Sequence, residues 1–600
     1  MDNPSPHQLL RVPTPTHESL SFCNATPREL KYWLDHLPKA NLGETARLLY
    51  QGLIELNRMK LSTEARLQLL ELLRPEVHSV CHHLERYFLQ QSIVLDERPR
   101  KVASLCQALQ NHLAIGYKLV VVRRAANFKR ERAQTLTLAL QRAIRSLSAA
   151  LVRSAQLYCP VPEGLWLELH QIYLVAQEFG LQQTPVRDNL AKQVRELTIE
   201  QSYLITLLLG SARCNQMRQG SIASLAEMLE SWSELVRLQD AEFPSSLFIV
   251  ATQVDGPPRY RTLFKDNDIG ASIGINPQML VNALKEYIEE TPEDRAKLSL
   301  KVSAGTSVDL LQHLAAAWGD IAERTFQRTP GHGQLTICIG MSALHYYLAG
   351  RQSFADVLRM QEYSQIPTFR TGVQDVWGEA FDSGKSSEWQ SNVSLEVIEY
   401  TPFTPTEGKV SPMEGEAEEF PIYSLPIVNH SPGGYCLSWT KDIPSQLQAG
   451  ELLGIQDAPD HAWSVAVVRW IRQVRAGGTQ VGIELIAPVA QPCGLKLLRK
   501  PEQSSQYLRA LLLPEIAVIS RPATLITPRL PFQEGNRVQI NVHGEERRAS
   551  LTRKLTSTGS FSQFEYRTQE TRSISDKPVT ASGEQLEHGE EDFDSLWKSL

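Results

Sequence analysis

The sequence predicts a multidomain α+β protein, in which an antiparallel α-helical N-terminal region precedes a β-barrel and a further small β domain. Three observations lead to this fold class. The chain has 600 residues, which is more than one hydrophobic core usually organises. Apolar residues recur at helical spacing up to about residue 240, and near residue 243 the pattern changes to alternating, strand-like runs separated by turns.

The first 20 residues are polar and contain proline, so we expect a disordered leader at 1–20. They lack the basic and apolar regions of a signal peptide. No apolar run is long enough to span a bilayer, so we expect a cytoplasmic protein without a transmembrane segment. The eight cysteines are scattered and form no CxxC pair, which suggests a reducing compartment and no metal or other cofactor.

Helical patterns fill residues 21–242. A helix-start signal stands at Thr26-Pro27-Arg28-Glu29, because Thr can cap free N–H groups, Pro suits the first helical position and Glu completes a capping box. Short loops between successive segments predict antiparallel helix pairs. The later helical patterns lie at 98–125, 131–158, 162–180, 188–209 and 219–238.

The second half of the chain divides by pattern. Residues 243–349 read as an α/β segment, in which Leu335, Ile337 and Ile339 alternate as in a strand with one buried face. Residues 350–420 become rich in Pro, Glu and Ser and read as an insertion. Two β-rich stretches follow at 421–500 and 501–567, and 568–600 reads as a flexible acidic tail.

The first β-rich stretch contains a recognisable order of motifs. Asn429-His430-Ser431-Pro432-Gly433-Gly434 fits the pattern (D/N)xSxxG and reads as a turn before an apolar strand. Gly450-Glu451 then opens a strand, Val465 and Val467 alternate in the next, and Gly482-Ile483-Glu484 closes the run. This order resembles the PilZ domain family of bacterial signalling proteins.

The resemblance implies a ligand site. PilZ proteins carry an RxxxR motif before the first barrel strand, and Arg324 and Arg328 have that spacing just before residues 335–339. Those residues would then form the first barrel strand, with the insertion behind it. The implied ligand is cyclic di-GMP, and the arginines would meet Asn429 and Ser431 in space although 101 positions separate Arg328 from Asn429.

The chemistry of these residue types suits that ligand, which has two phosphodiesters and two guanine edges. Arginine offers a planar fork of donors for phosphate and for the O6/N7 edge of guanine. Asn429 and Ser431 offer short side chains for hydrogen bonds. Gly433 and Gly434 let the backbone approach a ligand closely.

Two other functions remain open. The chain could keep the barrel as a scaffold or adaptor that has lost the nucleotide. It could also be a helical RNA- or membrane-associated protein, although a solvated helix face is the plainer interpretation of its basic cluster. That cluster comprises Arg123, Arg124, Lys129, Arg130 and Arg132. The net charge of −6 gives no field that favours DNA, and because no nucleophile–base or paired-carboxylate pattern stands out, we predict that the protein is not an enzyme.

The C-terminus suggests a protein partner. Phe593, Leu596, Trp597 and Leu600 fall on one face of a helix, and a segment of this length needs a groove to fold against. The groove would lie on a partner or on the chain's own helical region. The alternative is a frayed tail with chance spacing.

Overall fold

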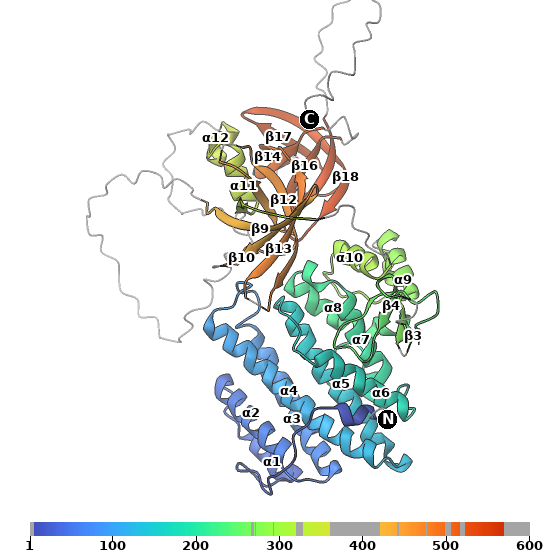
Figure 1. The fold of residues 1–600 in the computed structure, drawn as a ribbon. Helices are drawn as coiled ribbons and strands as arrows, with labels where there is room; N and C mark the ends of the chain where they lie inside the picture. The colour runs from blue at the N-terminus through green and yellow to red at the C-terminus, as the bar shows by residue number, and fades with distance from the viewer. Residues whose placement is uncertain are drawn as a thin grey trace, which may run out of the picture.

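The computed structural model describes most of the chain (Figure 1). The described residues are 5–265, 269–270, 272–291, 293–319, 328–359, 420–440, 443–459, 461–475, 477–498, 506–515 and 522–568. The predicted insertion and tail lie largely outside them. The predicted leader lies mostly within them and is ordered there: Pro6–Leu9 form a 3-10 helix, Leu10 is buried and His17 pairs with Met59.

The N-terminal region is a stack of helices in which α4 and α5 run side by side through the core. The predicted helix start is present, since the Thr26 side chain accepts a hydrogen bond from the backbone N–H of Glu29. The helices are α1 (Pro27–Asp35), α2 (Leu42–Arg58), α3 (Thr63–Glu85), α4 (Glu97–Ala126), α5 (Ala133–Gln156), α6 (Leu165–Glu178), α7 (Ile199–Ser211) and α8 (Gln219–Trp232).

One helix expected from the sequence is wrong in its first part. The apolar spacing predicts a helix over 188–209, but a short hairpin of β1 (Pro185–Arg187) and β2 (Glu196–Thr198) occupies its start. Two local features explain the difference. Thr198 forms a capping box with Gln201 and so begins α7 at Ile199, and the buried Asp188 is held by two hydrogen bonds from Arg74.

A small sheet follows the helices. Its strands are β3 (Arg237–Asp240), β4 (Phe248–Val250), β5 (Arg259–Tyr260) and β6 (Ile273–Asn276), in the order β3-β6-β4-β5. Helices α9 (Gln278–Glu289) and α10 (Val308–Gly319) pack against each other beside it.

The first barrel closes through six antiparallel strands. They run in the order β10-β13-β12-β11-β8-β9, and β9 also pairs with β10. β8 lies between β9 and β11, so residues 334–339 are part of the barrel. The strands are β8 (Gln334–Ile339), β9 (Tyr423–Ser431), β10 (Gly434–Trp439), β11 (Leu452–Gln456), β12 (Ser464–Gln473) and β13 (Thr479–Ala487).

The second β domain is also a closed barrel, with the order β14-β15-β16-β19-β18-β17. Helix α11 (Met341–Leu348) packs on both barrels and helix α12 (Phe354–Leu358) on the second. A shared apolar cluster that includes Leu344, Val465 and Phe561 joins the two barrels. The prediction of a multidomain α+β fold is therefore confirmed. The strands are β14 (Gln491–Leu497), β15 (Leu508–Leu513), β16 (Thr524–Pro528), β17 (Arg537–Val542), β18 (Glu545–Ser557) and β19 (Phe561–Thr568).

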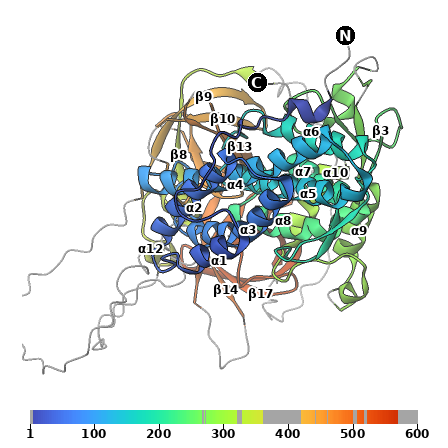
Figure 2. The same ribbon diagram turned by 90° about the horizontal axis from the view of Figure 1, so that it is seen from below.

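The helical region covers one end of the first barrel, and in Figure 2 the helices lie in front of the barrel strands. Ile93 and Tyr158 from the helical region are buried in the core cluster of this barrel, with Ile443, Leu447 and Ile471. Helix and barrel therefore share one hydrophobic core at this junction. Among the described residues, no helix has both the length and the apolar character needed to cross a membrane.

Candidate functional site

The predicted arginine and asparagine meet on the outside of the first barrel. The short strand β7 (Thr329–Pro330) pairs with β9 so that Thr329 faces His430 and Pro330 faces Asn429. This pairing carries the exposed Arg328 to the barrel, where its Nη1 donates to Asn429 Oδ1 at 3.4 Å. Arg324 lies outside the described residues.

The (D/N)xSxxG motif is split between a strand and a turn. Asn429 and Ser431 end β9, and only Pro432 and Gly433 form the connection to β10, which corrects the expectation that the whole motif is a turn. Ser431 Oγ donates to the carbonyl oxygen of Gly434 at 3.4 Å. A Cβ atom at Gly434 would lie 2.1 Å from the carbonyl oxygen of Ile483, so glycine is required for β10 to approach β13.

The same outer face continues across the neighbouring strands. Asn429 pairs with Cys436, Cys436 with Gly482, and Gly482 with Trp470. A Cβ atom at Gly482 would lie 2.0 Å from Trp470 Nε1, so the indole lies directly over the glycine backbone. An aromatic ring therefore rests on the sheet, in the row that begins with Asn429.

A second arginine borders this row. The Arg472 guanidinium lies 5.6 Å from the centre of the Trp470 ring, and its Nη2 donates to Gln480 Oε1 at 2.7 Å. The nearby carboxylate of Glu484 is already paired with Arg469 at 2.6 Å.

The pKa of the Cys436 thiol is affected by the charged residues around this row of paired residues. Burial raises the pKa of Cys436, and the positive charges of Arg328 and Arg472 act in the opposite direction. Both arginines are therefore close enough to act on one buried thiol in the middle of the row. An anionic, planar ligand on this face would meet a guanidinium group on each side and an aromatic surface beside them.

Trp470 and Arg472 were not among the residues predicted from the sequence. One signal was present: Trp470 and Arg472 flank the buried Ile471, and side chains alternate in a strand. Their position opposite Gly482 and Asn429 depends on strand register, which the sequence alone does not show.

Comparisons with known proteins cover the chain from the first helix to the last strand. Three family models match: residues 28–244 match "Cyclic-di-GMP receptor FimW, N-terminal domain", residues 247–492 match its "middle PilZ domain", and residues 493–569 match the "FimW C-terminal beta-barrel domain". A curated Pseudomonas aeruginosa protein (strain PAO1) named cyclic-di-GMP receptor FimW is 64% identical over 607 aligned residues, covering 100% of both chains. The chain belongs to the FimW family.

Membership of the FimW family confirms the PilZ resemblance seen in the motifs at 429–434, 450–451 and 482–484. The middle PilZ segment at 247–492 contains strands β4, β5 and β6 of the small sheet as well as the first barrel. No solved structure matches this FimW-family chain.

In this FimW-family protein the basic cluster spans the end of α4 and the residues that follow it, and several of its arginines already contact other protein groups. Arg124 forms an ion pair with Glu64, Arg132 lies 3.9 Å from the same carboxylate, and Arg123 Nη1 donates to the carbonyl oxygen of Leu61 at 2.6 Å. These contacts favour a structural role for Arg123 and Arg124 over binding of RNA or a membrane.

Proposed function

We propose that this protein binds cyclic di-GMP on the outer face of its PilZ barrel and acts as a ligand-binding regulator rather than an enzyme. The observation that carries the proposal is the contact between Arg328 and Asn429, which joins the two motifs across 101 positions. The name of the 64% identical relative, cyclic-di-GMP receptor FimW, supports the same ligand.

Each residue has a role that follows from its chemistry. Arg328 and Arg324 would bind the phosphodiesters or the O6/N7 edge of a guanine. Asn429 and Ser431 would add hydrogen bonds at the base edge or phosphate, and Gly433 and Gly434 would leave room for the ligand backbone.

The row beyond Asn429 would complete the site. Trp470 offers a face on which a guanine can stack, an interaction worth about 1–3 kcal/mol per base. Arg472 would add a second positive charge for a ligand that carries two phosphates.

Isothermal titration calorimetry of the full chain with cyclic di-GMP tests the proposal. Saturable binding is expected. If no heat of binding is detected at high micromolar ligand, the proposal is wrong and the barrel is the scaffold or adaptor that the sequence left open.

The regulatory output would be a protein contact in the cytoplasm, made through the helical region or the C-terminal tail. The tail residues Phe593, Leu596, Trp597 and Leu600 lie outside the described residues, so the proposal of a contact through the tail rests only on their helical spacing. A pull-down with the chain lacking residues 590–600 tests it. If the shortened chain retains every partner, the tail does not make the proposed contact.

A further inference from the structure

The C-terminal end of β12 connects the candidate site to the helical region. Side chains alternate along this strand, so Trp470 and Arg472 point outward while Ile471 and Gln473 point to the inner side. Gln473 is the residue after Arg472, yet it faces away from the outer surface where a ligand would bind.

Gln473 joins the barrel to the loop regions at the ends of two helical segments. Its Nε2 donates to the carbonyl oxygens of Ile93 and Leu157 at 2.8 and 3.0 Å. Its backbone N–H donates to the carbonyl oxygen of Tyr158 at 2.8 Å. Three hydrogen bonds from one residue therefore hold the end of β12 on the helical region.

The segment that receives these bonds is held in an unfavourable conformation. Tyr158 has φ = 53°, in the left-handed region that bulky residues rarely adopt. Its ring is buried in the barrel core cluster and its hydroxyl donates to the carbonyl oxygen of Met217 at 2.7 Å. Such a conformation persists only where the surroundings enforce it, and here the barrel supplies part of that enforcement.

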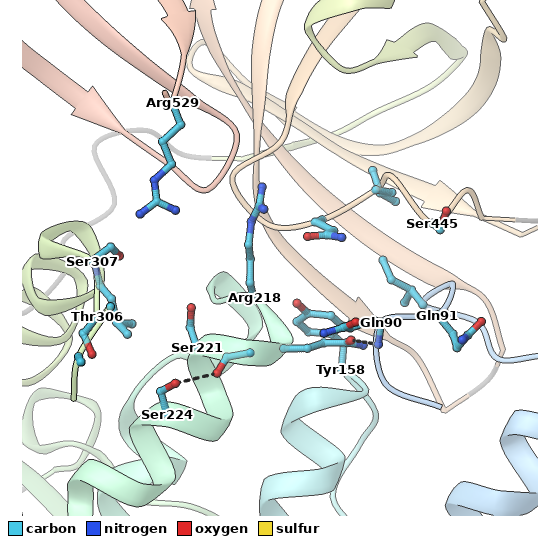
Figure 3. Close-up of a pocket in the computed structure, with 18 residues that line it drawn as sticks. Gln90, Gln91, Tyr158, Arg218, Ser221, Ser224, Thr306, Ser307, Ser445 and Arg529 are labelled. Atoms are coloured by element: carbon cyan, nitrogen blue, oxygen red, sulfur yellow. Dashed lines mark hydrogen bonds between the residues drawn. The ribbon is translucent and has the colours of Figure 1, made fainter. Parts of the chain in front are cut away.

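Other positions at the same junction share this feature. Gln90 and Arg213 also have positive φ values, of 61° and 53°. Gln90 and Tyr158 line a cavity of about 510 Å³ between the helical region and both barrels (Figure 3). Arg213 precedes the turn Cys214–Gln216, which contacts β12. Unfavourable backbone conformations beside open volume indicate a junction that can be tightened or loosened.

We propose that Gln473 is a positioning residue for the candidate site: it holds the end of β12 so that Trp470 and Arg472 are correctly placed, and ligand binding in turn stabilises the junction. This inference rests on the proposed function. Coupling between two sites is reciprocal. If the junction changes the affinity for the ligand, ligand binding must change the stability of the junction by the same free energy.

The first test measures affinity for cyclic di-GMP by calorimetry on the full chain. Gln473→Ala is expected to weaken binding by roughly fivefold or more, although its side chain cannot touch a ligand on the outer face. Ser92→Ala is the matched control, because Ser92 Oγ donates to the carbonyl oxygen of Ile443 at 2.7 Å in the same junction, and Ile443 lies outside β12. Near wild-type affinity is expected for Ser92→Ala.

The second test measures hydrogen exchange at the backbone amides of residues 157–159. Cyclic di-GMP should slow exchange there in the wild-type chain and have much less effect in Gln473→Ala. This wild-type measurement decides the question even if Gln473→Ala does not fold, since unchanged exchange would overturn the proposal.

The outcomes separate the two proposals. If the wild-type chain binds no cyclic di-GMP, the proposed function fails. If it binds and Gln473→Ala binds equally well, only the coupling through β12 fails. Equal losses in Gln473→Ala and Ser92→Ala would also overturn the coupling, because general weakening of the junction would then explain both.

Discussion

Arg218 of the helical region pairs with Glu451 of the PilZ barrel, with 3.4 Å between Nη2 and Oε2. The same guanidinium donates to the carbonyl oxygen of Ala449 at 3.2 Å and to Ser560 Oγ of the C-terminal barrel at 2.5 Å. One side chain therefore joins all three domains, beside the cavity shown in Figure 3.

Replacing Arg218 should destabilise the junction. Arg218→Ala removes one charge-assisted hydrogen bond to the buried Glu451 and two more to Ala449 and Ser560, and we expect a loss of about 2 kcal/mol in the free energy of unfolding. Thermal denaturation followed by circular dichroism measures it. Arg547→Ala, at an exposed position on β18, is the control and should change the midpoint little.

The glycine next to this arginine gives an independent check. A Cβ atom at Gly559 would lie 2.2 Å from the Arg218 guanidinium, so Gly559→Ala should displace it and lower the thermal midpoint. A Cβ atom at Gly220 on α8 would have no neighbour within 4 Å, and Gly220→Ala should be neutral or slightly stabilising. Equal midpoints for the two variants would contradict the importance of the Arg218 contacts.

The contact between Arg328 and Asn429 predicts the affinity of two single variants. Arg328→Ala and Asn429→Ala should each weaken cyclic di-GMP binding about tenfold, since a hydrogen bond to a charged group contributes about 1.5–3 kcal/mol. Because Arg328 is exposed, its variant should keep the wild-type thermal midpoint. Calorimetry measures the affinity, and unchanged binding by both variants would move the ligand site elsewhere.

The packing of Trp470 on Gly482 predicts a further loss of affinity. Gly482→Ala should push the indole off the strand, and Trp470→Ala should remove a stacking surface worth about 1–3 kcal/mol. Trp470→Phe keeps an aromatic face and should retain part of the affinity. If Trp470→Ala binds cyclic di-GMP as the wild type does, the site ends at Asn429 and does not extend across β13.

Two buried histidines predict a dependence of stability on pH. Burial lowers the pKa of His170 and His345 to about 4, from an ordinary value of 6.5. Above pH 6.5 these histidines are neutral in both states. As the pH falls from 6.5 towards 4, the unfolded chain gains protons that the folded chain excludes, so the free energy of unfolding decreases.

Denaturation in urea between pH 7.5 and 4.5 measures this effect. His170→Gln should flatten the pH dependence below pH 6.5, because His170 is enclosed by Tyr203 and the carbonyl oxygen of Gly256. His82→Gln, at an exposed position on α3, should leave the slope as it is in the wild type. If the free energy of unfolding depends on pH in the same way in both variants, the attribution of this dependence to the buried His170 is wrong.

The sequence by itself determined the fold class and the family. Apolar residues have helical spacing before residue 240 and alternate after it. The order of apolar residues shows these periods because it follows which face of each helix or strand is buried. The motifs at 429–434, 450–451 and 482–484 were sufficient for the PilZ resemblance, because their glycines and polar residues stand where strands begin, turn or meet.

Only the tertiary structure decided what surrounds the motifs. Strand register places Trp470 over Gly482 and in line with Asn429, and register depends on pairing between segments far apart in the chain. The pairing of β7 with β9 likewise carries Arg328 to Asn429 across 101 positions. Tyr158 is buried in the barrel core and Arg218 contacts two barrels because the domains pack on one another. Packing between domains produces no periodic pattern in the sequence of a single domain, so the sequence does not show these contacts.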